Sequence, residues 1–122
     1  MPRVVHFEIG VDDPLRAIAF YQDVFGWKIQ KWDGPMEYWL VMTGEKGEMG
    51  IDGGIVRRSN PVLQTVNTID VSDIDQYLDK VVAHGGSIVM PKSEIPEIGL
   101  FAYCRDTEGN PFGVLQPTMD MK

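Results

Sequence analysis

The chain has 122 residues, of which 43% are hydrophobic, and its formal net charge is −7. This length and composition fit one domain with a buried core, and no segment has the composition of a disordered region. The acidic balance, 18 acidic against 11 basic residues, argues against a surface that binds a nucleic-acid backbone.

A single cysteine, Cys104, excludes both an internal disulfide and a zinc site built from several cysteines. Charged residues near the start of the chain interrupt any hydrophobic region of a signal peptide. No apolar run approaches the length of a membrane span. We therefore expect a soluble, cytoplasmic protein with no nucleic-acid and no membrane partner.

The first predicted strand, residues 4–11, has two different faces. Apolar residues occupy every second position of one face, the period-two pattern of a strand: Val5, Phe7, Ile9 and Val11. His6 and Glu8 share the other face, two residues apart, so an imidazole and a carboxylate project from it together.

A helix is predicted next. Asp13 is a good N-cap, Pro14 suits the first helical position, and Gly26 is the expected left-handed stop. Strands are then expected at 27–32, 37–43 and 51–57. The adjacent glycines Gly53 and Gly54 in the last of these indicate a bulge or a group close to the backbone.

The second half repeats this order. A linker at Ser59–Pro61 leads to a strand at 64–71, a helix capped by Asp73, and strands at 87–90, 100–105 and 112–116, with a proline-containing loop at 91–99. Four positions of the first half have identical counterparts in the second: Ile9 with Ile69, Val11 with Val71, Asp13 with Asp73, and Gly26 with Gly86. The sequence thus predicts an α+β fold made by internal duplication, with βαβββ modules at 1–58 and 62–117 of one domain, 1–122.

Local motifs agree with one known family. Ala19–Tyr21, Phe25–Trp27 and the closing DTEGNPFGVLQP run, 106–117, resemble the glyoxalase/bleomycin resistance protein/extradiol dioxygenase (vicinal oxygen chelate) superfamily. The resemblance spans essentially the whole chain, and Thr107 stands where the family turn usually has proline. It implies a U-shaped, incompletely closed eight-stranded mixed-sheet barrel with the helices outside. A homodimer is also expected, since small two-module chains commonly pair and sheet edges need cover.

The resemblance also implies a divalent metal held by the first and last strands of each module. Carried over by position, the first ligand falls on His6, but the others fall near Val66, Gly53 and Gly113, which supply no donor. His6 is therefore the only metal ligand that this comparison predicts, and the sequence favours no metal cofactor. Glu48 and Asp52 could donate a carboxylate only if the register is shifted, and His84 is better explained as the end of a helix.

The pair of His6 and Glu8 has three possible interpretations. They could form a catalytic acid/base pair in which Glu8 fixes the tautomer of the imidazole, they could be the remnant of a metal site, or they could be polar lining without chemistry. The aromatic residues Trp39, Phe101 and Tyr103 are candidate ligand contacts, with Tyr38 as the alternative to Trp39; core packing is an equally good explanation. Cys104 has no visible base and is interpreted as an inert buried thiol.

Three functions are compatible with these residues. The first is a metal-free protein of the bleomycin resistance type that binds a small organic molecule in an aromatic-lined cavity. The alternative is a metal-dependent lyase or isomerase of the lactoylglutathione lyase kind, or a dioxygenase, acting on a small oxygenated substrate. A structural or regulatory dimer without a ligand is the third possibility.

Overall fold

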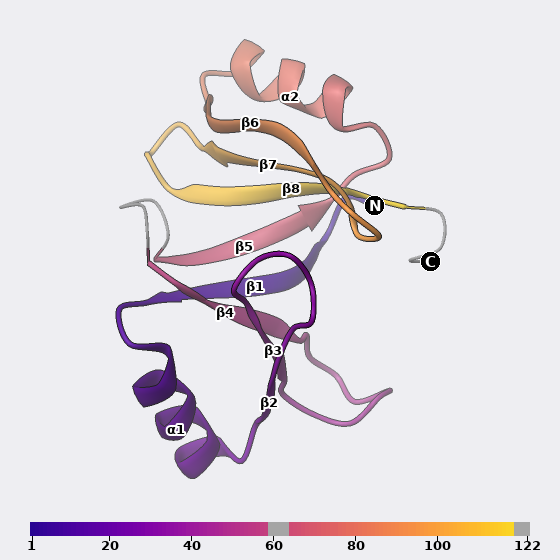
Figure 1. Ribbon diagram of the computed structural model, residues 1–122. Coiled ribbons are helices and arrows are strands. Elements are labelled where there is room, and N and C mark those ends of the chain that lie inside the picture. The colour runs from indigo at the N-terminus through magenta and orange to yellow at the C-terminus, as the bar shows by residue number, and fades with distance from the viewer. Residues whose placement is uncertain (59–63, 119–122) are drawn as a thin grey trace. The chain divides into compact units, whose positions relative to one another are not determined.

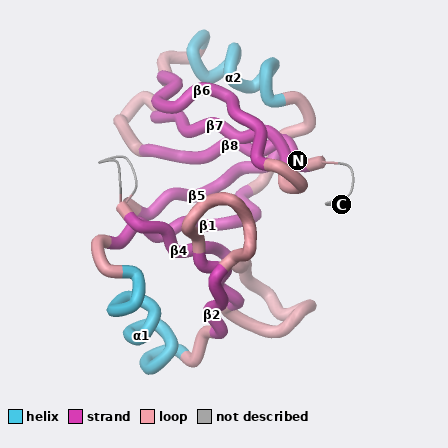
Figure 2. The backbone as a smooth tube through the Cα atoms, in the orientation of Figure 1, coloured by secondary structure: helices cyan, strands magenta, loops and turns pink. Residues whose placement is uncertain are grey.

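The structure, a computed structural model, describes residues 1–58 and 64–118. Its helices and strands follow the predicted order, one βαβββ series after another (Figures 1 and 2). In chain order they are β1 (Val4–Val11), α1 (Pro14–Phe25), β2 (Lys28–Lys31), β3 (Trp39–Met42), β4 (Gly53–Arg57), β5 (Thr65–Asp70), α2 (Ile74–Ala83), β6 (Ser87–Ile95), β7 (Gly99–Arg105) and β8 (Pro111–Pro117).

The predicted α+β fold is confirmed. The strands are hydrogen-bonded in the order β2-β3-β4-β1-β5-β8-β7-β6, which makes one mixed, incompletely closed sheet with β2 and β6 at its ends. Within each series the first strand pairs in parallel with the last, β1 with β4 and β5 with β8. The remaining neighbours within each series are antiparallel. The two series therefore have the same internal strand order, as a duplication requires.

The chain divides into two compact units. One runs from His6 to Val66, and the other combines Met1–Val5 with the chain from Asn67 onward. The first two residues of β1 thus belong with the second series. The predicted linker Ser59–Pro61 lies outside the described residues, so the predicted module boundaries at 58 and 62 stay predictions.

The first unit buries its core between its strands and α1. The helix begins as predicted: the Asp13 side chain accepts a hydrogen bond from Arg16 N at 3.1 Å, and Gly26 ends the helix with φ of 71°. The core consists of three buried residues and the apolar side chains packed on them: Trp39, Val41 and Ile55, with Phe7, Ile9, Val11, Ile18, Tyr21, Trp27 and Ile29. The apolar face of β1 is therefore the face that α1 covers.

The second unit repeats this arrangement around α2. Asp73 caps the helix by accepting a hydrogen bond from Gln76 N at 3.2 Å. Ala102 and Cys104 of β7 lie in the core beneath the helix with Ile74 and Leu78. Since side chains alternate along a strand, Phe101 and Tyr103 lie on the opposite face of β7. Burial raises the pKa of the Cys104 thiol, which agrees with an inert cysteine.

One strand is longer than its sequence indicated. A loop was expected from Pro91 onward, but β6 continues to Ile95, paired with β7. The pairing contains register shifts between Ile88 and Met90 and between Met90 and Ser93. Because β6 is an end strand and is irregular at Pro91, the missing N–H of the proline breaks no required ladder bond. Within the described residues, neither helix is long and apolar enough to cross a membrane.

Candidate functional site

Three polar side chains of the first unit meet on the face of the sheet opposite α1. Tyr38, which directly precedes β3, places its hydroxyl 2.7 Å from Nε2 of His6. The same hydroxyl donates a hydrogen bond of 3.3 Å to Oε2 of Glu8. His6 and Glu8 project from β1 together, as their spacing predicts, and Tyr38 bridges them. We call these three residues the His6–Tyr38–Glu8 chain.

A glycine makes room for this bridge. Glu8 of β1 pairs with Gly54 of β4, so both residues face the same side of the sheet. A β-carbon at Gly54 would overlap the ring and hydroxyl of Tyr38. The glycine pair was expected to mark either a bulge or a close approach to the backbone. The pairing of β4 with β1 and β3 runs without a register shift through both glycines, so close approach is the explanation.

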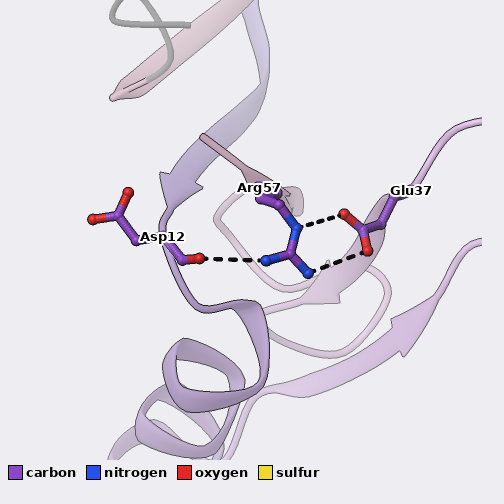
Figure 3. Close-up of polar contacts among 3 residues, drawn as sticks. All are labelled: Asp12, Glu37 and Arg57. Carbon is purple, nitrogen blue, oxygen red and sulfur yellow. Dashed lines mark hydrogen bonds and ion pairs between the residues drawn. The ribbon is translucent and has the colours of Figure 1, made fainter. Parts of the chain in front are cut away.

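Backbone pairing and an ion pair hold Tyr38 in place. Its carbonyl oxygen accepts a hydrogen bond from Trp32 N at 2.8 Å, which extends the pairing of β2 with β3. The preceding residue, Glu37, is bound through both carboxylate oxygens by the Arg57 guanidinium, at 3.0 and 3.4 Å (Figure 3). Arg57 also donates to the carbonyl oxygen of Asp12 at 3.4 Å. The segment that carries Tyr38 is thus fixed on both sides.

The hydrogen bonds set the direction of proton donation. An ionised Glu8 carboxylate only accepts, so the Tyr38 hydroxyl donates to it and accepts from the His6 N–H. Nε2 then carries the imidazole proton, and Nδ1 is the acceptor of the neutral ring. Burial lowers the pKa of His6 below its ordinary value of 6.5, and the negative charge of Asp52 opposes that shift. Burial thus favours the uncharged form of the ring.

The loop between β3 and β4 contains two further acids named from the sequence. Asp52 Oδ1 accepts hydrogen bonds from Thr43 N at 2.9 Å and from the Thr43 hydroxyl at 3.4 Å. Glu48 Oε1 accepts a hydrogen bond from Glu45 N at 2.6 Å. Both carboxylates thus stabilise the loop itself, and Asp52 acts on His6 through its charge.

In the second unit the corresponding face is aromatic. Phe101 and Tyr103 of β7 meet edge to face, with their ring centroids 4.7 Å apart. The Phe101 ring lies over Gly113, since a β-carbon there would stand 2.6 Å from Cζ of the ring. The predicted orientation of both residues, away from α2, agrees with their position beside the buried Ala102 and Cys104. Ligand contact by Phe101 and Tyr103 stays a prediction.

The remaining candidates lie elsewhere. The sequence named Trp39 as a candidate ligand contact with Tyr38 as its alternative, and the structure places Tyr38, not Trp39, beside His6. Trp39 is buried beneath α1 with Val41 and Ile55, where core packing accounts for it. His84 is the C-cap of α2, as the helix-end explanation predicted. Sequence reasoning named Tyr38 only as the alternative to Trp39, and it named Gly54 only through the Gly–Gly pair, which indicated a bulge or a close approach to the backbone.

The donor set does not fit the metal centre that the resemblance implies. The three other carried-over positions lie on Val66, which is fully buried, and on Gly53 and Gly113, which have no donor atom. Gly53 pairs with Phe7 and faces the α1 side, so even its position is wrong for a partner of His6. Within residues 1–58 and 64–118, no three His, Cys, Asp or Glu side chains group around a possible ion.

Comparison with known proteins identifies the family to which the chain belongs. Residues 3–114 match the model of the Glyoxalase/Bleomycin resistance protein/Dioxygenase superfamily. The chain belongs to this superfamily. The match extends from the residue before β1 into β8, so both βαβββ series contribute to it.

Relatives within the superfamily are distant. The chain is 30% identical over 108 residues to a glyoxylase-like domain-containing protein of Didymella fabae, covering 84% of each. It is 29% identical over 114 residues to the putative glyoxylase CFP32 of Mycobacterium bovis, but covers only 42% of that protein. Among solved structures, methylmalonyl-CoA epimerase from Mycobacterium tuberculosis matches with a TM-score of 0.68 at 15% identity, over 97% of this chain and 89% of that one. This structural likeness shows the shared fold.

Proposed function

We propose that the chain binds a small oxygenated organic molecule at the His6–Tyr38–Glu8 chain, without the metal centre of the superfamily's enzymes. The observation that carries this proposal is the hydrogen-bonded bridge of Tyr38 between His6 and Glu8, at 2.7 and 3.3 Å. Two residues on one strand and a third from another segment converge over a glycine that makes room for them. Polar groups brought together from separate segments are typical of a binding site.

The hydrogen-bonding groups of the His6–Tyr38–Glu8 chain define which ligand groups it would bind. With Nε2 protonated, Nδ1 of a neutral His6 accepts a hydrogen bond from a ligand hydroxyl or N–H. The bridge to the Glu8 carboxylate would stabilise positive charge on the imidazole if the ligand gave up its proton. The same arrangement would therefore serve binding and, for an acidic ligand, proton transfer.

A metal-dependent lyase, isomerase or dioxygenase is the alternative. His6 favours it, as does the description of CFP32 as a putative glyoxylase. The donor set described above favours the metal-free function. Metal analysis separates the two: we expect no stoichiometric metal in the purified, untagged chain, even after soaking with Ni²⁺, Zn²⁺, Mn²⁺ and Fe²⁺. About one ion per chain or per dimer would support the alternative.

The binding proposal is tested by screening small hydroxylated and carbonyl compounds against chelator-treated protein, with ligand-observed NMR. Each hit is then titrated into the wild type, His6→Gln and Tyr38→Phe. We expect both variants to weaken binding roughly tenfold, the loss of about one hydrogen bond. His84→Gln, which changes the other histidine at the end of α2, is the matched control. Hits that bind all four proteins equally would refute the proposal.

Two accompanying expectations belong to this proposal. We propose a homodimer, to be measured by sedimentation at several concentrations, because β2 and β6 are end strands of the sheet. A cytoplasmic location stays a prediction, to be tested by fractionation of the source cells.

A further inference from the structure

The two units build the same feature at equivalent strand positions. Parallel pairing sets Glu8 beside Gly54 in the first unit and Thr68 beside Gly113 in the second. An aromatic ring lies over each glycine, Tyr38 over Gly54 and Phe101 over Gly113. Thr68 is therefore the counterpart of Glu8, and Phe101 is the counterpart of Tyr38.

The counterparts differ in their polar groups. Tyr38 has a hydroxyl that hydrogen-bonds to both His6 and Glu8. Phe101 has no hydroxyl, so its side chain cannot hydrogen-bond to Thr68. The position two residues before Thr68, equivalent to His6, is the fully buried Val66. The second unit thus has an apolar version of the same feature with one polar group remaining.

That polar group is unpaired within the part of the chain that the structure describes. Oγ1 of Thr68 is buried and makes no hydrogen bond to any of the described residues. It would stand 3.1 Å from a β-carbon at Gly113, and Cζ of Phe101 would stand 2.6 Å from the same point. The hydroxyl and the end of the aromatic ring therefore lie close together above Gly113, and the ring fills the position over the glycine. A buried hydroxyl without a partner destabilises the folded chain, so its presence calls for an explanation.

We propose that Thr68, Phe101, Tyr103 and Gly113 form a second ligand site, for a planar aromatic molecule that carries one neutral oxygen. The half-buried Phe101 ring turns toward solvent, the ligand ring replaces it over Gly113 and against Tyr103, and the ligand oxygen pairs with the Thr68 hydroxyl. The edge-to-face contact of Phe101 with Tyr103 shows that Tyr103 already accommodates one ring at this place. The site is independent of His6, so either proposal can fail alone.

Acetophenone and ethylbenzene are the probes, because they share a shape and differ in the carbonyl oxygen. Each is added at equal millimolar concentration to isotope-labelled wild-type protein, and the NMR signals of Thr68, Phe101 and Tyr103 are followed. We expect saturable shifts at these three residues with acetophenone and clearly smaller shifts with ethylbenzene. Equal shifts with both probes, or none with acetophenone, would overturn the proposal.

Thr68→Val separates the ligand role from a structural one, because it removes the hydroxyl and keeps the shape. We expect acetophenone to bind roughly tenfold more weakly, while Tm rises by roughly 3 °C or more, because the unpaired group is gone. Thr118→Val is the matched control, since Thr118 Oγ1 is also buried and unpaired among the described residues. It should leave acetophenone binding unchanged.

Phe101→Tyr gives a second route to the answer if Thr68→Val does not fold. The new hydroxyl stands at Cζ, beside the Thr68 hydroxyl, and recreates the arrangement of Tyr38 in the first unit. We expect it to raise Tm and to weaken acetophenone binding at least fivefold. Undiminished acetophenone binding in either folded variant would contradict the proposal.

Discussion

The hydroxyl of Tyr38 lies 2.7 Å from Nε2 of His6, although 32 positions of sequence separate the two residues. The contact joins the polar face of β1 to the segment that enters β3. Because Tyr38 also donates to Glu8, the three side chains form one unit, and changing any of them should alter the other two.

We expect Tyr38→Phe to lower the free energy of unfolding by about 1 kcal/mol, since two partly buried polar groups lose a partner while the ring stays in place. Urea denaturation measures this difference. Tyr77→Phe in α2 is the control, and its change should lie within about 0.5 kcal/mol, because the half-buried ring keeps its packing on the core of the second unit. A Tyr38→Phe variant as stable as the wild type would show that the bridge contributes nothing to folding.

Gly54→Ala should destabilise the chain by about 1–3 kcal/mol, because its β-carbon overlaps the ring and hydroxyl of Tyr38. A double-mutant cycle with Tyr38→Ala tests this cause. With the ring removed, the alanine at 54 meets no Tyr38 side chain, and most of the loss should disappear. An equal loss in both backgrounds would mean that the glycine serves the backbone and makes no room for Tyr38.

The sequence predicted one part of this site and not the other. His6 and Glu8 follow from alternation along a single strand, which is local information. Tyr38 reaches them through the pairing of β3 with β4, and that register depends on contacts far apart in the chain. Between Tyr38 and Trp39, only the register decides which one faces α1, because a shift of one residue exchanges the two faces.

The fold could be predicted more fully than the site, because the sequence patterns that indicate its helices and strands occur in both halves of the chain. Helix caps at Asp13 and Asp73 and the alternation of β1 are short-range features that occur in both halves. The loop predicted from Pro91 onward was wrong because proline normally ends a strand. β6 is an end strand with shifted register, and proline is tolerated there. No local pattern indicates whether a strand is central or at an edge.

The lowered pKa of His6 predicts acid sensitivity. As pH falls below about 6.5, the unfolded chain binds a proton at this imidazole while the folded chain does not, so stability is lost. The loss continues until pH falls through the folded pKa, where both states are protonated. Tm of the wild type should therefore fall more than that of His6→Gln between about pH 7.5 and about pH 5.

His84→Gln is the comparison for this measurement, since it removes the other histidine from the end of α2. It should follow the wild type over the same pH range. NMR titration of the His6 ring in the intact protein gives the folded pKa directly, and a value at or above 6.5 would contradict the assignment. Tyr38 hydrogen-bonds to this ring, Glu8 accepts a hydrogen bond from Tyr38, and Asp52 acts on the ring through its negative charge.

Arg57 should position Tyr38 through the bidentate pair with Glu37 (Figure 3). Arg57→Lys keeps the charge but loses the two parallel contacts, so we expect the His6 NMR signals to shift with only a small change in Tm. Added salt should weaken the effect of the exposed pair. Arg105→Lys, at the end of β7, is the control; His6 signals that respond equally to both would rule out a positioning role for Arg57.

Asp106 should determine the stability of the turn that precedes β8. Its carboxylate accepts hydrogen bonds from Glu108 N and Asn110 N, both at 2.9 Å, and from the Asn110 side chain at 3.2 Å. These bonds hold the pKa of Asp106 below its usual value of 3.8, so their stabilisation is present above that pH and is lost as pH falls through the folded pKa. We expect Asp106→Ala to lower Tm at neutral pH and Asp106→Asn to lower it less, because the amide oxygen still accepts from the backbone. The gap between wild type and Asp106→Ala should close at strongly acidic pH, and a gap that persists there would assign the effect to the backbone of the turn.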